Sequence, residues 1–343
     1  MRRLTAAVAC AALAAGAGSS TVRAQTPALT NACHVSPIVD DLDIAAHFYH
    51  DLLGLDLVPA PPPGPLPVDT DSGHLLLHGV PNARLRFIGA RIPGVRCGVE
   101  IVELKNVDRT PVHRRYQDPG AATLILTVRD LDGLVTVLKK NRVALLTTGG
   151  APVQVTAATG PARAVTVQDP DGHFVELVQP DVIPDTKVPP SSNVVGIGLR
   201  LTVGDVTRAV TFYQQLSGIA GSVGVFENDR HRLALAGLPQ TAELRTGMMP
   251  IPGSSRTLEF IQFRGLDSRP AAVASRVQDP GSYRLQLTFR DIGAALERLG
   301  LAGRRTISTG GGPVTMTFGG RPWKLAVVPD PDNLFLVVQQ APQ

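Results

Sequence analysis

A carboxylate lies inside an apolar segment near the middle of the chain, where a buried strand would normally carry no charged side chain. In VQDPDGHFVELVQP (167–180), the residues FVELV are typical of a strand buried on both faces, yet Glu176 lies at their centre. Burying an ionised carboxylate without a partner costs several kcal/mol. Glu176 therefore needs a cation, such as a metal ion or an arginine, or hydrogen bonds, or an open and wet cup around it.

The chain contains its own control for this residue. The later segment NLFLVVQ (333–339) repeats the same turn and the same apolar residues, but Val337 replaces the glutamate. Because this strand forms equally well with valine, the fold does not need Glu176. The sequence therefore indicates that Glu176 holds something, and we predict a metal ion.

The elements that position Glu176 belong to a repeat that covers nearly the whole chain. Residues 29–180 recur as residues 193–340 at an offset of 161 to 164, joined by a Pro- and Ser-rich linker at 181–192. A finer offset of 89 places Asp41 on Asp130 within the first copy. The chain is thus four similar units, and each is expected to read strand, helix and three strands.

Each predicted helix begins after an aspartate-containing turn. AAHFYHDLLG and RAVTFYQQLSG have apolar residues at helical spacing, and Gly54 and Gly218 are placed to end these two helices. We therefore expect an α+β fold of two tandem modules, 29–180 and 193–340.

The N-terminus has the pattern of an export signal. Two arginines precede an uncharged, Ala-rich run from Leu4 to Val22, and Val22-Arg23-Ala24 is a small-residue cleavage pattern. We predict that residues 1–24 are a signal peptide and that the mature protein is periplasmic or secreted; an uncleaved anchor is the alternative. After cleavage no stretch has transmembrane length.

The charge of the mature chain is small. The formal net charge is +4, and cleavage removes Arg2, Arg3 and Arg23, which leaves 4 − 3 = +1. Nothing in this balance favours nucleic acid as a partner. Export leaves Cys33 and Cys97, which could form one disulfide; strand alternation, with His34 and Glu103 on one face, places the two thiols on opposite faces and argues against it.

The paired β-α-β-β-β units, opened by HVSPIVDDLDIAAHFYHDLLGL and closed by DPDGHFVEL, resemble the vicinal oxygen chelate superfamily, which includes glyoxalase I, extradiol dioxygenases and bleomycin-resistance proteins. The resemblance covers the chain after the signal segment. It implies that two units curl into an open, barrel-like cup with a divalent metal inside, held by residues of the first and last strands.

Carried over to this chain, the resemblance implies the metal ligands His34, Glu103 and Glu176, with Thr123 at the fourth position. One imidazole and two carboxylates suit Zn, Mn, Fe, Co or Ni and leave positions open for two substrate oxygens. Glyoxalase-type members also use a metal-site glutamate as a base, a role that falls here to Glu176 or Glu103. Glu100 is the alternative to Glu103 if the register is wrong.

The other candidates are weaker. The matching positions of the second copy are Gly198, Gln262, Arg284 and Val337, which do not make a metal site. His173 is expected to serve the turn before the Glu176 strand, while His74 or His78 could approach a substrate.

Two functions follow from these residues. The first is an exported, metal-dependent enzyme that binds a small substrate through adjacent oxygens and catalyses an isomerisation, a lyase step or an oxidative cleavage. The second is a metal-free ligand-binding or resistance protein of the bleomycin-resistance type, favoured by Thr123 and by the second module. Exposed strand edges in such modules often pair, so a homodimer is a further expectation.

Overall fold

The computed structural model describes residues 28–342 except 62, 70, 96, 158–159, 253, 255, 268–273 and 302. The predicted signal peptide, residues 1–24, lies outside the described residues. Within the described part of the chain, no helix is both long and apolar enough to cross a membrane.

The four units of the repeat fold alike, each with a first strand, a helix and further strands. The first unit comprises β1 (Leu29–Val39), α1 (Leu42–His47), the π-helical turn Phe48–Leu52, β2 (Asp56–Val58), α2 (Ser72–Leu77), β3 (Arg84–Arg91) and β4 (Gly98–Lys105). The second comprises β5 (Ala122–Val128), α3 (Leu131–Lys140), a 3-10 turn (Thr148–Gly150), β6 (Val153–Ala157), β7 (Gly160–Gln168) and β8 (Phe174–Pro180).

The second half of the chain repeats this order. The third unit comprises β9 (Val194–Thr202), α4 (Val206–Ser217), β10 (Ser222–Val223), α5 (Arg230–Leu235), β11 (Glu243–Pro250) and β12 (Thr257–Arg264). The fourth comprises β13 (Tyr283–Phe289), α6 (Ile292–Leu301), a 3-10 turn (Thr309–Gly311), β14 (Val314–Phe318), β15 (Arg321–Pro329) and β16 (Phe335–Gln340).

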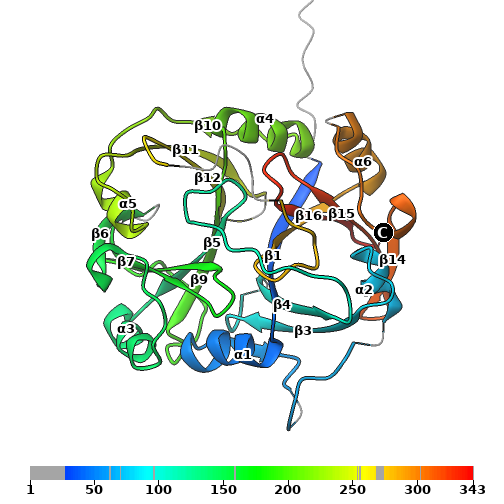
Figure 1. Ribbon diagram of the computed structural model, residues 1–343, viewed down its shortest axis with the longest axis horizontal. Coiled ribbons are helices and arrows are strands. Elements are labelled where there is room, and N and C mark those ends of the chain that lie inside the picture. The colour runs from blue at the N-terminus through cyan, green and yellow to red at the C-terminus, as the bar shows by residue number, and fades with distance from the viewer. Residues whose placement is uncertain are drawn as a thin grey trace, which may run out of the picture.

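The units pair across the two halves of the chain. One curled sheet has the order β14-β15-β16-β13-β1-β4-β3-β2 and joins the first unit to the fourth. The other has the order β10-β11-β12-β9-β5-β8-β7-β6 and joins the second unit to the third (Figure 1). The central contacts are the antiparallel pairs β1–β13 and β5–β9. The predicted α+β fold with two cups is confirmed, and each cup takes one unit from each half.

Every unit begins its main helix in the same way. An aspartate caps the first turn; Asp41, for example, accepts hydrogen bonds from two backbone N–H groups of α1. A side chain near the end of the unit's last strand accepts the N–H of the first helical residue. The four acceptors are Glu103 (from Leu42, 3.0 Å), Gln179 (from Leu131, 2.9 Å), Gln262 (from Val206, 3.1 Å) and Gln340 (from Ile292, 2.9 Å). This repeated contact ties each helix to its own sheet.

Buried contacts also tie the two sheets together. The largest apolar cluster contains residues of α1, α3, α4 and α6 and of strands from both sheets. The Tyr49 hydroxyl donates to Asp169 at 3.0 Å, and the Tyr213 hydroxyl donates to Asp330 at 3.0 Å. Each of these bonds joins the helix of one unit to the turn before the last strand of the next, so neighbouring units pack side by side although they do not share a sheet.

Cys97 is disulfide-bonded, which contradicts the expectation drawn from strand alternation. The premise of that expectation was wrong, because Glu103 does not share the face of His34. The parallel register of β1 and β4 pairs His34 with Gly98, and this places the backbone of Cys33 beside Cys97.

Two candidate ligand cavities

Each sheet encloses one sizeable cavity on its concave face. The cavity between the first and fourth units, called here the outer cavity, has a volume of about 360 Å³. The cavity between the second and third units, called the inner cavity, has a volume of about 200 Å³. The two differ in how their polar residues are used.

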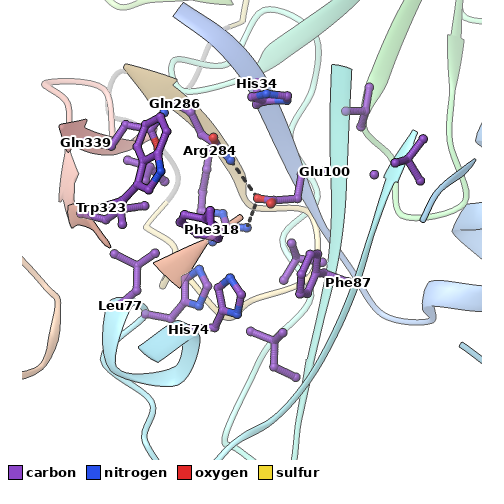
Figure 2. A pocket seen from close by; sticks show the side chains of 18 of the residues that line it. His34, His74, Leu77, Phe87, Glu100, Arg284, Gln286, Phe318, Trp323 and Gln339 are labelled. Atoms are coloured by element: carbon purple, nitrogen blue, oxygen red, sulfur yellow. Dashed lines mark hydrogen bonds and ion pairs between the residues drawn. The ribbon is translucent and has the colours of Figure 1, made fainter. Parts of the chain in front are cut away.

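Glu100 lies at the centre of the outer cavity. Its Oε2 accepts a hydrogen bond from Gln286 at 2.8 Å and one from the Ser36 hydroxyl at 3.2 Å, and it lies 3.7 Å from the guanidinium of Arg284. Figure 2 shows Arg284 and Gln286 of β13 converging on Glu100 from the opposite side of the cavity, with His34 of β1 nearby. The first and fourth units therefore build this polar centre together.

Arg284 has unused donors in the outer cavity. Only 2 % of the residue is exposed, yet its Nε and Nη2 have no hydrogen-bond partner among the described residues. Burial lowers the pKa of Arg284 to about 10, although the charge of Glu100 opposes the shift. A buried guanidinium with unsatisfied N–H groups is costly, so this arrangement calls for an acceptor in the cavity.

Three histidines line the same cavity, and the pKa of two of them, His34 and His78, is lowered. Burial lowers the pKa of His34, and the charges of Arg91 and Arg256 lower it further against the opposing effect of Glu100. Burial and the charge of Arg284 hold the pKa of His78 well below its ordinary value, and neither ring nitrogen of His78 has a hydrogen-bond partner among the described residues. His74 pairs with Asp69. The predicted approach of His74 or His78 to a ligand is consistent with these positions.

The inner cavity is organised around Arg200 of β9. Its Nη1 lies 2.5 Å from Glu176 and its Nε lies 2.7 Å from Glu259, while Nη1 also donates to the Tyr116 hydroxyl at 3.0 Å. The second oxygen of Glu259 accepts from Arg232 at 2.6 Å. The cation that Glu176 needs is thus supplied by an arginine, from the strand that begins the next unit.

The three predicted metal ligands lie in three different places. His34 lines the outer cavity, and Glu176 lines the inner cavity in the other sheet. Glu103 lines neither; its two oxygens accept from Arg86 at 2.8 and 2.6 Å, and one also accepts the N–H of Leu42. Burial alone would raise the pKa of Glu103, but these hydrogen bonds lower it to about 2. The structure does not bring the three residues together.

The repeat indicates that Glu100, and not Glu103, is the cavity-facing residue of the first unit. Glu103 is equivalent to Gln179, Gln262 and Gln340, which all receive the helix N–H. Three residues before them stand Glu100, Glu176, Glu259 and Val337, which face the cavities. The spacing between Glu176 and Gln179 was visible in the sequence, and applying it to the first unit selects Glu100 over Glu103.

His173 and Thr123 line neither of the two cavities. His173 is buried and contacts Asp169 at 2.9 Å and the Ser282 carbonyl at 3.1 Å, so its predicted role in the turn is confirmed. Thr123 pairs with Phe174 in the neighbouring strand.

The sequence of residues 33–177 matches the family model of the Glyoxalase/Bleomycin resistance protein/Dioxygenase superfamily. This match assigns the first copy of the repeat to this superfamily. Its fold is similar to that of glyoxalase I from Zea mays, with a TM-score of 0.55 and 18 % identity over 90 % of this chain and 92 % of that one. It is also similar to a putative dioxygenase from Bacillus subtilis subsp. subtilis str. 168, with a TM-score of 0.51 and 11 % identity over 93 % of this chain and 87 % of that one.

These structural likenesses concern the fold, because the identities are low. No curated protein sequence matches the chain significantly. The chemistry of each cavity therefore depends on its own residues.

The residues present do not fit the divalent metal that the superfamily implies. The positions that face the cups are His34, Glu100, Arg284 and Val337 in the outer cavity and Ile125, Glu176, Gly198 and Glu259 in the inner cavity. At these equivalent positions each cavity offers two ligand-type side chains, and each places a guanidinium beside a carboxylate. Among the described residues, no group of three or more His, Cys, Asp and Glu side chains is arranged to hold a metal ion.

Proposed function

We propose that the protein is a metal-independent binding protein of this superfamily that holds a small organic anion in the outer cavity. The observation that carries the proposal is Arg284, a buried guanidinium whose Nε and Nη2 lack acceptors and which lines a cavity of about 360 Å³. A carboxylate matches a guanidinium in shape and charge, since it can accept two parallel N–H bonds.

The walls of the outer cavity indicate the body of this ligand. Phe87, Phe318 and Trp323 line it together with Leu77 and Leu325. Aromatic side chains stack on flat, apolar groups, and sites for small molecules combine such walls with a few polar groups that fix orientation. The proposed ligand is therefore a carboxylate with a planar or aromatic body.

The charge of the outer cavity also favours an anion. Apart from the histidines, its charged lining residues are Arg91, Arg284 and Glu100, which gives a formal charge of 2 − 1 = +1. Glu100 accepts hydrogen bonds from Gln286 and Ser36 and offsets part of the charge of Arg284, 3.7 Å away. The donors that remain available to a ligand are Nε and Nη2 of Arg284, because Arg91 is exposed to solvent.

The chain has a built-in probe for this site. Trp323 is its single tryptophan and lines the outer cavity. We expect 3-phenylpropanoate to change the fluorescence of Trp323 saturably and 3-phenylpropanamide, which lacks the charge, to bind at least about tenfold more weakly. Arg284→Gln should weaken the carboxylate by a similar factor, whereas Arg264→Gln, at an exposed arginine paired with Glu243, should not. Equal binding of acid and amide would count against the proposal.

A metal-dependent enzyme remains the second candidate, because His34 and Glu100 line the same cavity. Elemental analysis of the protein, purified after growth with Zn, Mn and Fe supplied, separates the two candidates. Substoichiometric metal supports the binding protein. One metal ion per chain that is lost in both His34→Ala and Glu100→Gln supports the enzyme.

Export is also part of the proposal. The disulfide at Cys97 supports it, since disulfides persist mainly in oxidising compartments. N-terminal sequencing of the protein from the periplasm or the medium should begin at Gln25. A mature protein that begins at Met1 and stays in the cytoplasm would contradict export.

A further inference from the structure

We propose that the inner cavity is a second and separate binding site, which takes a small organic monocarboxylate with a compact aliphatic body. This site lies in the other sheet and shares no strand with the outer cavity. It does not depend on the function proposed for the outer cavity.

The two carboxylates of the inner cavity are already neutralised. Glu176 accepts from Arg200 through both oxygens, at 2.5 and 3.3 Å, and Glu259 is shared between Arg200 and Arg232. Only 3 % of Glu176 and 8 % of Glu259 are exposed. Both carboxylates are therefore paired with arginines of the protein and are not available to a cationic ligand or a metal ion.

Arg256 is the charge that remains. It lies just before β12, is half-buried, and lines the inner cavity. Its side chain makes no ion pair and no hydrogen bond with any described residue, and burial lowers its pKa. With Arg200, Arg232 and Arg256 set against Glu176 and Glu259, the lining carries 3 − 2 = +1. A ligand with a single negative charge would neutralise this +1, and its carboxylate would bind at Arg256.

The remaining walls set the body of the ligand. Ile125, Val155, Val178, Leu235 and Met248 line the inner cavity and present aliphatic groups, in contrast to the aromatic walls of the outer cavity. The volume of about 200 Å³ accommodates a small branched acid better than a bicyclic one. A dianion would bring its second charge toward Glu176 and Glu259, which disfavours it.

The test uses isothermal titration with 3-methylbutanoate, while 3-phenylpropanoate at saturating concentration occupies the outer cavity. We expect one 3-methylbutanoate to bind per chain and the fluorescence of Trp323 to stay constant during the titration. The neutral 3-methylbutanamide should bind at least about tenfold more weakly. If 3-phenylpropanoate proves not to bind at all, the titration is run without it, so failure of the outer-cavity proposal is seen separately.

Two variants assign the binding to the inner cavity. Arg256→Gln should weaken 3-methylbutanoate at least about tenfold and leave the response of Trp323 to 3-phenylpropanoate unchanged. Met248→Trp adds bulk to the same cavity at a position that is 38 % exposed, and it should also weaken 3-methylbutanoate without removing a charge. Absence of binding to the wild-type protein, or binding that both variants leave intact, would overturn the proposal.

Discussion

At the scale of single residues, Glu103 is a structural group and not a ligand for substrate or metal. It is fully buried, accepts the N–H of Leu42, and pairs with Arg86 at 2.6 Å. Glu103→Ala leaves that N–H and the Nε and Nη2 donors of buried Arg86 without their acceptor, although Arg86 keeps its pair with Asp43, and should lower the free energy of unfolding by about 3 kcal/mol. Glu103→Gln restores the residue type of the other three units and should cost only about 1 kcal/mol.

Urea denaturation of the two variants measures this difference. Gln262→Ala is the matched control. Gln262 accepts the N–H of Val206 and a hydrogen bond from Arg245 at 2.8 Å, and Glu103 accepts the corresponding bonds from Leu42 and Arg86. Binding in the outer cavity should survive Glu103→Gln unchanged. A stable Glu103→Ala protein that has lost binding would show that Glu103 acts at the site instead.

The demand of Glu176 for a cation could be predicted from the sequence, but the identity of that cation could not. A carboxylate in an apolar strand can be neutralised by a metal ion or by an arginine, and the sequence around Glu176 is compatible with either cation. Arg200 lies on the first strand of the next unit, and only the pairing of β5 with β9 brings it to Glu176. No local pattern around Glu176 contains that pairing.

At the scale of elements, the turn before β16 should make stability depend on pH. Burial, together with the charge of Asp332, raises the pKa of Asp330 from 3.8 to about 6. Between these values the folded state binds a proton that the unfolded state does not, so this group stabilises the fold as the pH falls through the window and loses that contribution as the pH rises. The shift corresponds to roughly 3 kcal/mol.

Urea denaturation near pH 4 and near pH 7 tests this contribution. Relative to Asp330→Asn, the wild-type protein should gain stability at the lower pH. Asp291→Asn, at the exposed cap of α6, keeps a good capping residue and is the control. The same pH dependence in the wild type and in Asp330→Asn would assign it to other groups.

The elements themselves follow from local sequence, whereas the irregularity of one strand does not. The aspartate caps and the glycines at the helix ends are local signals, and Gly218 ends α4 in the left-handed conformation as expected. The pairing of β1 with β13 shifts register between Ala32 and Val35. The prediction for Cys97 failed for a different reason: it placed Glu103 on the face of His34, which the parallel pairing of β1 with β4 excludes.

At the scale of the whole molecule, the choice of partner units could not be read from the repeat. All four units have the same order of elements, so pairing the first with the second or with the fourth buries similar apolar strands. The structure pairs the first with the fourth and the second with the third. That choice separates His34 from Glu176 and gives each cavity residues from both halves of the chain.

This topology makes the two halves dependent on each other. A chain of residues 29–192 alone would lose β13 from β1 and β9 from β5, which are the central pairs of both sheets. Two long strand edges would then be exposed, and such edges pair with other chains. We expect this half to form a dimer through exchanged units, or to aggregate, in light scattering after size exclusion. Coexpression with residues 193–342 should restore a one-to-one complex with the Trp323 response of the intact protein. A folded, monomeric first half would show that the pairing of units across the halves is not required for folding.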